Sequence, residues 1–129
     1  MIFREDNLQT QCAQYLDFKR LLWCHVANER KTTHKSGKRL KRKGVKSGVP
    51  DCLIFNRKGG YGGLAIEIKT ERFNGLKKNG EPKATIKTKL TDSQKYWLAK
   101  LKEQDWYTCV VYNFEDFKII VDNYLRGKL

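Results

Sequence analysis

Two acidic residues and a lysine in the middle of the chain could do chemistry together. Asp51 follows a short segment that ends in proline, and Glu67 and Lys69 stand two residues apart further along. Carboxylate oxygens without histidine or cysteine suit a hard divalent ion such as Mg²⁺ or Mn²⁺ rather than zinc. Such an ion acidifies a bound water and neutralises charge on a phosphoryl group, and a neighbouring lysine can orient the attacking water. The alternative is an exposed strand with ordinary charged residues, because Glu-x-Lys occurs often by chance.

Two apolar runs around a glycine-rich turn would bring these residues together. The runs begin at Cys52 and Leu64, and residues 59–63 between them are glycine apart from one tyrosine. This pattern predicts two antiparallel strands of a hairpin. Folding the hairpin at its turn places Asp51 opposite the stretch 67–70. Because successive side chains of a strand alternate, the acid and the lysine of that stretch project from one face.

The proximity of two acids has an electrostatic cost. Two carboxylates about 4 Å apart repel by roughly 4 kcal/mol at an effective dielectric of ~20. A fold tolerates this repulsion if one acid holds a proton or if a cation lies between the acids. We therefore take Asp51, Glu67 and Lys69 as the candidate catalytic residues, with the two acids as candidate ligands of the ion.

Several blocks of the sequence resemble one nuclease superfamily. Asp51 followed by Glu67-Ile68-Lys69 resembles the PD-(D/E)XK nuclease core. The longer blocks look like its VRR-NUC branch, the virus-type replication-repair nucleases; they are residues 25–30, 40–51, 63–70 and 90–98. One departure stands at residues 104–106, which read Gln-Asp-Trp where the family tends to have a glycine after a helix.

The resemblance implies a fold, an activity and a partner. The fold is a restriction-endonuclease-like α/β core, in which helices flank a mixed β-sheet. The activity is metal-dependent, structure-selective DNA endonuclease cleavage that leaves a 5′-phosphate and a 3′-hydroxyl, with the main-chain carbonyl of Ile68 as a further ligand of Mg²⁺ or Mn²⁺. Compact members resemble Holliday-junction resolvases, so a homodimer acting on four-way or other branched junctions is the expected form, and its two-fold symmetry matches such a junction.

Three further polar residues are candidates, and two of them also have a structural explanation. Glu5 shares the helical stripe of Leu8 and would be a metal ligand, as in related nucleases that draw an acid from the first helix, or would stabilise the helix N-terminus. Gln94 would contact phosphate or water, as the resemblance implies, or would complete a capping box with Thr91. Asn28 matches a family block and is expected at the rim of the site.

Positive charge is concentrated in two stretches. The chain has 27 Lys and Arg against 14 Asp and Glu, a formal net charge of +13. Both stretches are poor in apolar residues, so we expect mobile basic loops at about 30–47 and 71–89 that flank the site and bind a polyanion. Neither has interleaved aromatic residues, which argues against a stacking platform for single strands. The expected DNA contacts are Lys38, Arg39, Lys41, Arg42, Lys43, Lys46, Lys77, Lys78, Lys87 and Lys89.

The remaining patterns complete a scaffold of α-β-β-β-α-β-α order within a single domain, residues 1–129. Helices are expected over 4–22, after Thr91 and after Asn113, and outer strands over 23–26 and 106–112. We expect the four cysteines to be reduced and packed in the core, and His25 to be packed or hydrogen-bonded rather than a zinc ligand. No secretory signal or membrane span is predicted, and no small-molecule cofactor. A bacterial cytoplasm, in a phage or prophage setting, is what the family suggests.

Two other functions fit the same composition. A non-catalytic, basic nucleic-acid-binding module on a degenerate nuclease fold would bind DNA without cutting it. A basic RNA-binding or structural protein would bind double-stranded RNA and be indifferent to Mg²⁺. The intact set of Asp51, Glu67 and Lys69 favours the nuclease, and cleavage with and without EDTA would separate the three.

Overall fold

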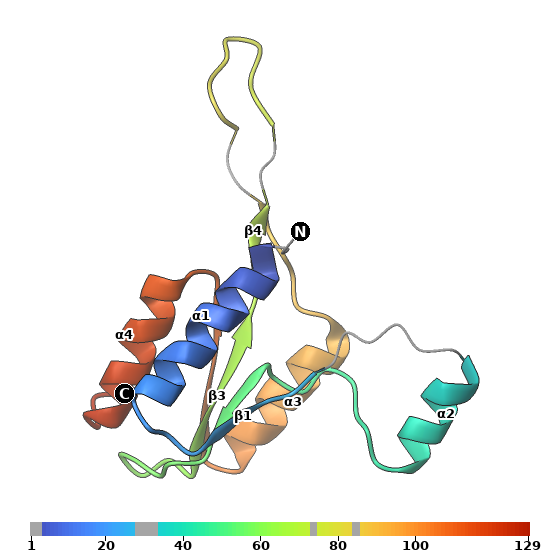
Figure 1. Ribbon diagram of the computed structural model, residues 1–129, viewed down its shortest axis with the longest axis vertical. Coiled ribbons are helices and arrows are strands. Elements are labelled where there is room, and N and C mark those ends of the chain that lie inside the picture. The colour runs from blue at the N-terminus through green and yellow to red at the C-terminus, as the bar shows by residue number, and fades with distance from the viewer. Residues whose placement is uncertain (1–3, 28–33, 73–74, 84–85) are drawn as a thin grey trace.

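A four-stranded mixed sheet forms the centre of the protein, with helices on both faces (Figure 1). The computed structural model describes residues 4–27, 34–72, 75–83 and 86–129. Helices α1 (Arg4–Phe18) and α4 (Phe114–Leu125) cover one face of the sheet, and α3 (Asp92–Glu103) lies against the other. The expected α/β class with helices flanking a mixed sheet is confirmed.

The strands lie in the order β1-β2-β3-β6. β1 (Trp23–His25), β2 (Cys52–Ile54) and β3 (Gly63–Ile68) pair antiparallel, and β6 (Trp106–Val111) runs parallel to β3. A parallel pair needs a crossover connection, which here contains α3. The hairpin predicted from the glycine turn is confirmed, because Cys52 pairs with Ile66.

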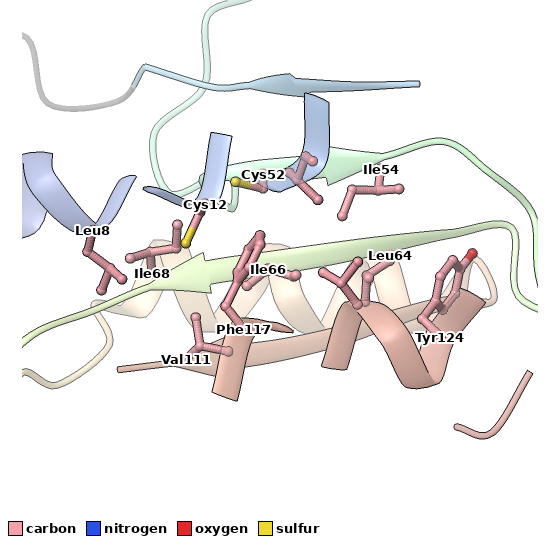
Figure 2. Close-up of a cluster of buried hydrophobic side chains, with 12 residues drawn as sticks. Leu8, Cys12, Cys52, Ile54, Leu64, Ile66, Ile68, Val111, Phe117 and Tyr124 are labelled. Carbon is pink, nitrogen blue, oxygen red and sulfur yellow. The ribbon is translucent and has the colours of Figure 1, made fainter. Parts of the chain in front are cut away.

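Alternation along β3 divides the sheet into two unlike faces. Leu64, Ile66 and Ile68 point toward α1 and α4 and form the core (Figure 2). Leu8 and Cys12 from α1 pack against them, as do Phe117, Val121 and Tyr124 from α4. The odd-numbered residues of β3, including Glu67, face the side of the sheet that α3 covers. No described residue of α3 is itself fully buried.

Capping residues set the helix boundaries. Thr91 accepts a hydrogen bond from the main-chain N–H of Gln94, and the Gln94 side chain accepts one from the Thr91 N–H, so the predicted capping box is confirmed. Asn113 caps α4 as predicted and accepts from the N–H of Asp116. α1 ends at Phe18 rather than at residue 22, because Arg20 adopts a left-handed conformation (φ 56°) and closes the helix.

The first basic stretch contains a helix rather than only the expected mobile loop. Residues His34–Arg42 form α2, which lies apart from the core at the right of Figure 1. Lysine and arginine are good helix formers, and the basic residues in the last turn of α2 complement the negative end of the helix dipole. Low hydrophobicity is therefore a misleading signal for a loop in this stretch.

The second basic stretch is a hairpin arm, which the prediction of a loop also missed. β4 (Glu71–Arg72) pairs antiparallel with β5 (Ile86–Lys87), and Leu76 forms a bridge with Pro82 nearer the tip. The arm projects from the core at the top of Figure 1. Its turn contains Gly80 at a positive φ of 85°. The expected elements appear in the predicted order, with α2, β4 and β5 in addition.

The thiols are free but do not all lie in the core. Cys12 and Cys52 are buried and Cys109 is half-buried, whereas Cys24 is exposed. The prediction of core packing is wrong for Cys24, because β1 is the edge strand of the sheet. Within the residues that the structure describes, no helix is long and apolar enough to cross a bilayer.

Candidate functional site

Asp51 is held at the start of β2 by three hydrogen bonds. The residue is only 4% exposed, and Oδ2 accepts a 2.7 Å hydrogen bond from the main-chain N–H of Ile68. Its main-chain carbonyl accepts from the N–H of Val26 at 2.9 Å, and Nδ1 of His25 donates to the same oxygen at 2.9 Å. His25 is therefore hydrogen-bonded, as predicted, and it fixes the backbone of the acid.

Glu67 and Lys69 reach the same region from β3. Glu67 lies next to Ile66 in the strand, and the register that pairs Ile66 with Cys52 places Glu67 opposite Asp51. Glu67 is 4% exposed and Lys69 is 9% exposed. The Lys69 N–H donates to the carbonyl of Val111 at 2.9 Å, which ties the end of β3 to β6. Two acids and one amine thus lie together, largely shielded from water.

A close backbone contact sets the position of the segment before Asp51. Gly48 has a positive φ of 84°, and a Cβ built on it would lie 2.5 Å from the carbonyl carbon of Ser93. Only glycine fits both the left-handed conformation and the approach to α3. The fully buried Pro50 then leads into Asp51. The glycine is visible in the sequence, but the helix terminus that it packs against is not.

The thiol beside the acids is not a nucleophile. Burial raises the pKa of the Cys52 thiol to about 12, and the nearby carboxylate of Asp51 also raises it, against the opposing effect of a hydrogen bond from Gln9 Nε2 at 3.7 Å. A thiol needs its thiolate form to attack or to bind a metal. The side chains left for chemistry at this site are the two carboxylates and the amine.

The donor set suits a hard divalent ion. In the described ranges, no group of three or more His, Cys, Asp or Glu side chains gathers where it could hold a metal. The acids at this site are Asp51 and Glu67, and the main chain beside them adds oxygen atoms. Mg²⁺ binds in this way, through one or two carboxylates with several waters retained. The residues present therefore fit the ion that their chemistry suggested.

The other predicted site residues have separate positions. Glu5 belongs to the first turn of α1, but its side chain lies outside the described residues, as does the whole of Asn28. α1 starts beside the C-terminal end of β3, where Leu8 packs near Ile68 (Figure 2). Gln94 uses its side-chain oxygen in the capping box at 2.9 Å. The structural explanation of Gln94 is therefore satisfied, and its contact with phosphate or water stays a prediction.

The predicted DNA contacts are exposed on two projections that adjoin the acids in sequence. β4 starts two residues after Lys69, so the hairpin arm rises directly from the end of β3. α2 ends nine residues before Asp51. The exposed basic side chains of the first projection and its following segment are Lys38, Arg39, Lys41, Arg42, Lys43 and Lys46. Those of the arm and its return are Lys77, Lys78, Lys87 and Lys89.

Comparison with known proteins finds a matching family and a similar fold. The model of the VRR-NUC domain family matches residues 3–113. A solved structure titled "VRR_NUC domain protein" superposes with a TM-score of 0.70 at 23% sequence identity, covering 98% of this chain and 91% of that one. No curated protein matches the chain. The structural likeness supports the restriction-endonuclease-like fold.

Proposed function

The chain belongs to the VRR-NUC domain family, a family of nuclease-type domains, and on that premise we propose that it is a divalent-metal-dependent endonuclease of branched DNA. The observation that carries the proposal is the buried set of Asp51, Glu67 and Lys69, which two exposed basic projections flank in the sequence. Burying two acids beside one amine is unfavourable unless a cation compensates them. A surface that only binds DNA would not need this arrangement.

Asp51, Glu67 and the carbonyl of Ile68 would hold Mg²⁺ or Mn²⁺. In an extended strand, the N–H and C=O of one residue point to the same side. Because the Ile68 N–H donates to Asp51, the Ile68 carbonyl is expected on the Asp51 side of β3. When bound, the ion supplies an acidified water and neutralises charge on the phosphoryl group.

Lys69 has a role that the acids cannot perform. Its backbone is fixed by the Val111 carbonyl, and alternation along the strand places its side chain on the face of Glu67. The amine orients the attacking water and stabilises negative charge that develops on the phosphate. Hydrolysis would leave a 5′-phosphate and a 3′-hydroxyl.

The basic projections would bind the phosphate backbone without reading sequence. Lysine and arginine contacts to phosphate position a protein on DNA but carry little sequence information. α2 and the arm leave the core in different directions (Figure 1), so together they suit a branched substrate better than one straight duplex. A homodimer would place two sites on opposed strands of a four-way junction.

A panel of labelled DNAs tests the proposed function. Four-way junction, flap, duplex and single-stranded DNA are incubated with the protein in Mg²⁺, in Mn²⁺ and in EDTA. We expect metal-dependent cleavage of the branched DNAs, and we expect Asp51→Ala and Lys69→Ala to abolish cleavage while junction binding persists. Full activity of either purified variant would contradict the catalytic assignment. Tight binding with no cleavage under any condition would favour the non-catalytic binding module.

A further inference from the structure

A second feature of the α3 side is a surface pocket next to the segment that carries Asp51. The pocket has a volume of about 550 Å³. Its walls come from the residues just before Gly48 and from the exposed side of α3. The residues that give the pocket its chemistry are Lys46, Ser47, Ser93, Tyr96, Trp97 and Lys100. Its volume lies within the range of small-ligand sites.

The pocket contains an exposed aromatic face. Tyr96 is 57% exposed, so much of the residue is open to a ligand in the pocket. The ring packs against Trp97 in a T-shaped arrangement with centroids 6.3 Å apart and planes at 89°. The Lys100 ammonium lies 5.8 Å from the Tyr96 ring centre and pairs with Glu103 at 3.3 Å. Neighbours within α3 therefore hold the Tyr96 ring in place, while much of the residue stays open to solvent.

Cations and hydroxyls line the same pocket as Tyr96. Lys46 forms no ion pair with any residue that the structure describes, and its side chain is exposed. Ser47 adds a hydroxyl group that can donate or accept a hydrogen bond, and the Ser93 hydroxyl shares a 3.2 Å hydrogen bond with the Thr91 hydroxyl. A planar aromatic platform with nearby cations and hydroxyls has the chemistry to bind a nucleotide. The ring can stack on a base, and the ammonium group can contact a phosphate.

We propose that this pocket binds one unpaired nucleotide of the DNA strand next to the cleavage site, with its base stacked on Tyr96. Asp51 lies four positions after Ser47, which limits their Cα separation to about 14 Å. Because Gly48 packs against Ser93, the pocket wall and the segment bearing Asp51 are held as one piece. A nucleotide in the pocket would therefore lie near the phosphate at Asp51, as the proposal requires.

This inference rests on the proposed function and explains how the protein would select branched DNA over plain duplex DNA. A base within a duplex is paired and stacked on both sides, so it cannot present its face to Tyr96 without leaving the helix. A branch point, flap or single-stranded end offers such a base at little cost. The two basic stretches lack interleaved aromatic residues, but α3 supplies the aromatic platform instead.

Photochemical crosslinking tests the contact directly. A flap DNA carries 5-iododeoxyuridine at one position at a time along its unpaired strand, and wild-type protein is irradiated with it in EDTA. We expect one strong crosslink, at a nucleotide close to the branch, and mass spectrometry should map it to Tyr96 or Trp97. A crosslink that maps only to α2 or to the hairpin arm would overturn the proposal, as would equal crosslinking at every position.

Binding measurements with variants add a second readout. Tyr96→Ala should weaken binding of flap DNA about tenfold, as expected for the loss of one base–aromatic stack, and should leave blunt duplex binding unchanged. Tyr96→Phe and Tyr96→Trp should restore flap binding. Phe18→Ala, which removes an aromatic ring that is 77% exposed on α1, and Lys95→Ala, next to Tyr96 but outside the pocket lining, are matched controls. Equal losses on flap and duplex would contradict the proposal.

The failures of the two proposals can be told apart. If the protein cuts branched DNA but Tyr96 neither crosslinks nor affects flap preference, the pocket assignment fails and the nuclease assignment stands. If no cleavage occurs but the crosslink forms at Tyr96, the pocket assignment stands and the nuclease assignment fails. Free deoxynucleotide added in excess should compete with the flap if the pocket reads base and phosphate, and absence of competition at any concentration would count against it.

Discussion

The main-chain N–H of Ile68 donates a 2.7 Å hydrogen bond to Oδ2 of Asp51. The side chain of Asp51 thus occupies the place where a neighbouring strand would accept that hydrogen bond. The carboxylate takes the role of a strand carbonyl and joins the start of β2 to the end of β3. It also places an acid beside Glu67 and Lys69 in a region that is largely closed to water.

The hydrogen bond predicts different effects of two substitutions of Asp51. Asp51→Asn keeps an oxygen that can accept from Ile68 and removes a charge beside Glu67, so its free energy of unfolding should equal or exceed that of the wild type. Asp51→Ala leaves the buried N–H of Ile68 without a partner and should be less stable than Asp51→Asn by about 1–3 kcal/mol. Urea denaturation measures the difference. Both variants should lose cleavage. Equal free energies of unfolding for the two variants would contradict this account of the Ile68 hydrogen bond.

The contact between Gly48 and Ser93 predicts a strong effect of one methyl group. Gly48→Ala combines a positive φ with a 2.5 Å contact, so the segment before Asp51 must move. Gly44→Ala is the matched control, because Gly44 also has a positive φ (97°) but has no neighbour within 4 Å of its Cβ position. The control should cost about 1–2 kcal/mol from backbone conformation alone. Gly48→Ala should cost about 1–3 kcal/mol more than the control because of overpacking. It should also reduce cleavage. Similar unfolding curves for the two variants would show that the contact is unimportant.

The exposed charges of α2 predict a change in salt dependence. Neutralising Lys38, Lys41 and Arg42 to alanine should weaken binding to all duplex and branched DNAs alike. For every phosphate that is no longer neutralised, the slope of log affinity against log salt should become shallower by about 0.9. Lys128→Ala, an exposed lysine near the C-terminus, is the control and should leave the slope unchanged. An unchanged slope in the triple variant would place the DNA elsewhere on the protein.

Thiol reactivity tests the burial pattern around the acids. Burial raises the pKa of both Cys52 and Cys109 to about 12, and it raises the pKa of Cys12 as well. These three thiols therefore stay protonated at about pH 8 in the folded protein and should react slowly with a thiol reagent. Cys24 is exposed and should react first, and all four should react in urea. Rapid reaction of Cys52 in the folded protein would contradict the described packing against Asp51.

The core of the fold could be predicted because its signals are local. Glycines at the turn set the hairpin register, and alternation separated Ile66 and Ile68 from Glu67. Thr91 and Asn113 marked helix starts through side chains that bond only a few residues away. Each of these signals depends on neighbours in the chain, so the sequence contained them in full.

Features that depend on distant contacts could not be predicted in the same way. The hydrogen bond from Ile68 to Asp51 and the packing of Gly48 on Ser93 require the folded arrangement. The polar residues of α2 and the arm predict loops, although lysine and arginine favour a helix in the first case.

Two helix ends show why boundaries are harder than centres. Arg20 closes α1 and Asp105 follows the C-cap of α3, both in the left-handed conformation that usually belongs to glycine (φ 56° and 64°). Residue type therefore gave no signal at either end. At Asp105 the chain keeps a helix stop where the resemblance predicts a glycine, so this departure changes the residue and not the fold.

The central claim is that Asp51, Glu67 and Lys69 act together in metal-dependent hydrolysis. The most direct measurement is the cleavage rate of a labelled four-way junction by wild type and Lys69→Ala as Mg²⁺ is titrated, with binding measured in parallel. We expect wild-type cleavage that rises with Mg²⁺ and stops in EDTA, and no cleavage by Lys69→Ala at equal junction affinity. Cleavage that persists in EDTA, or that Lys69→Ala retains in full, would contradict the account.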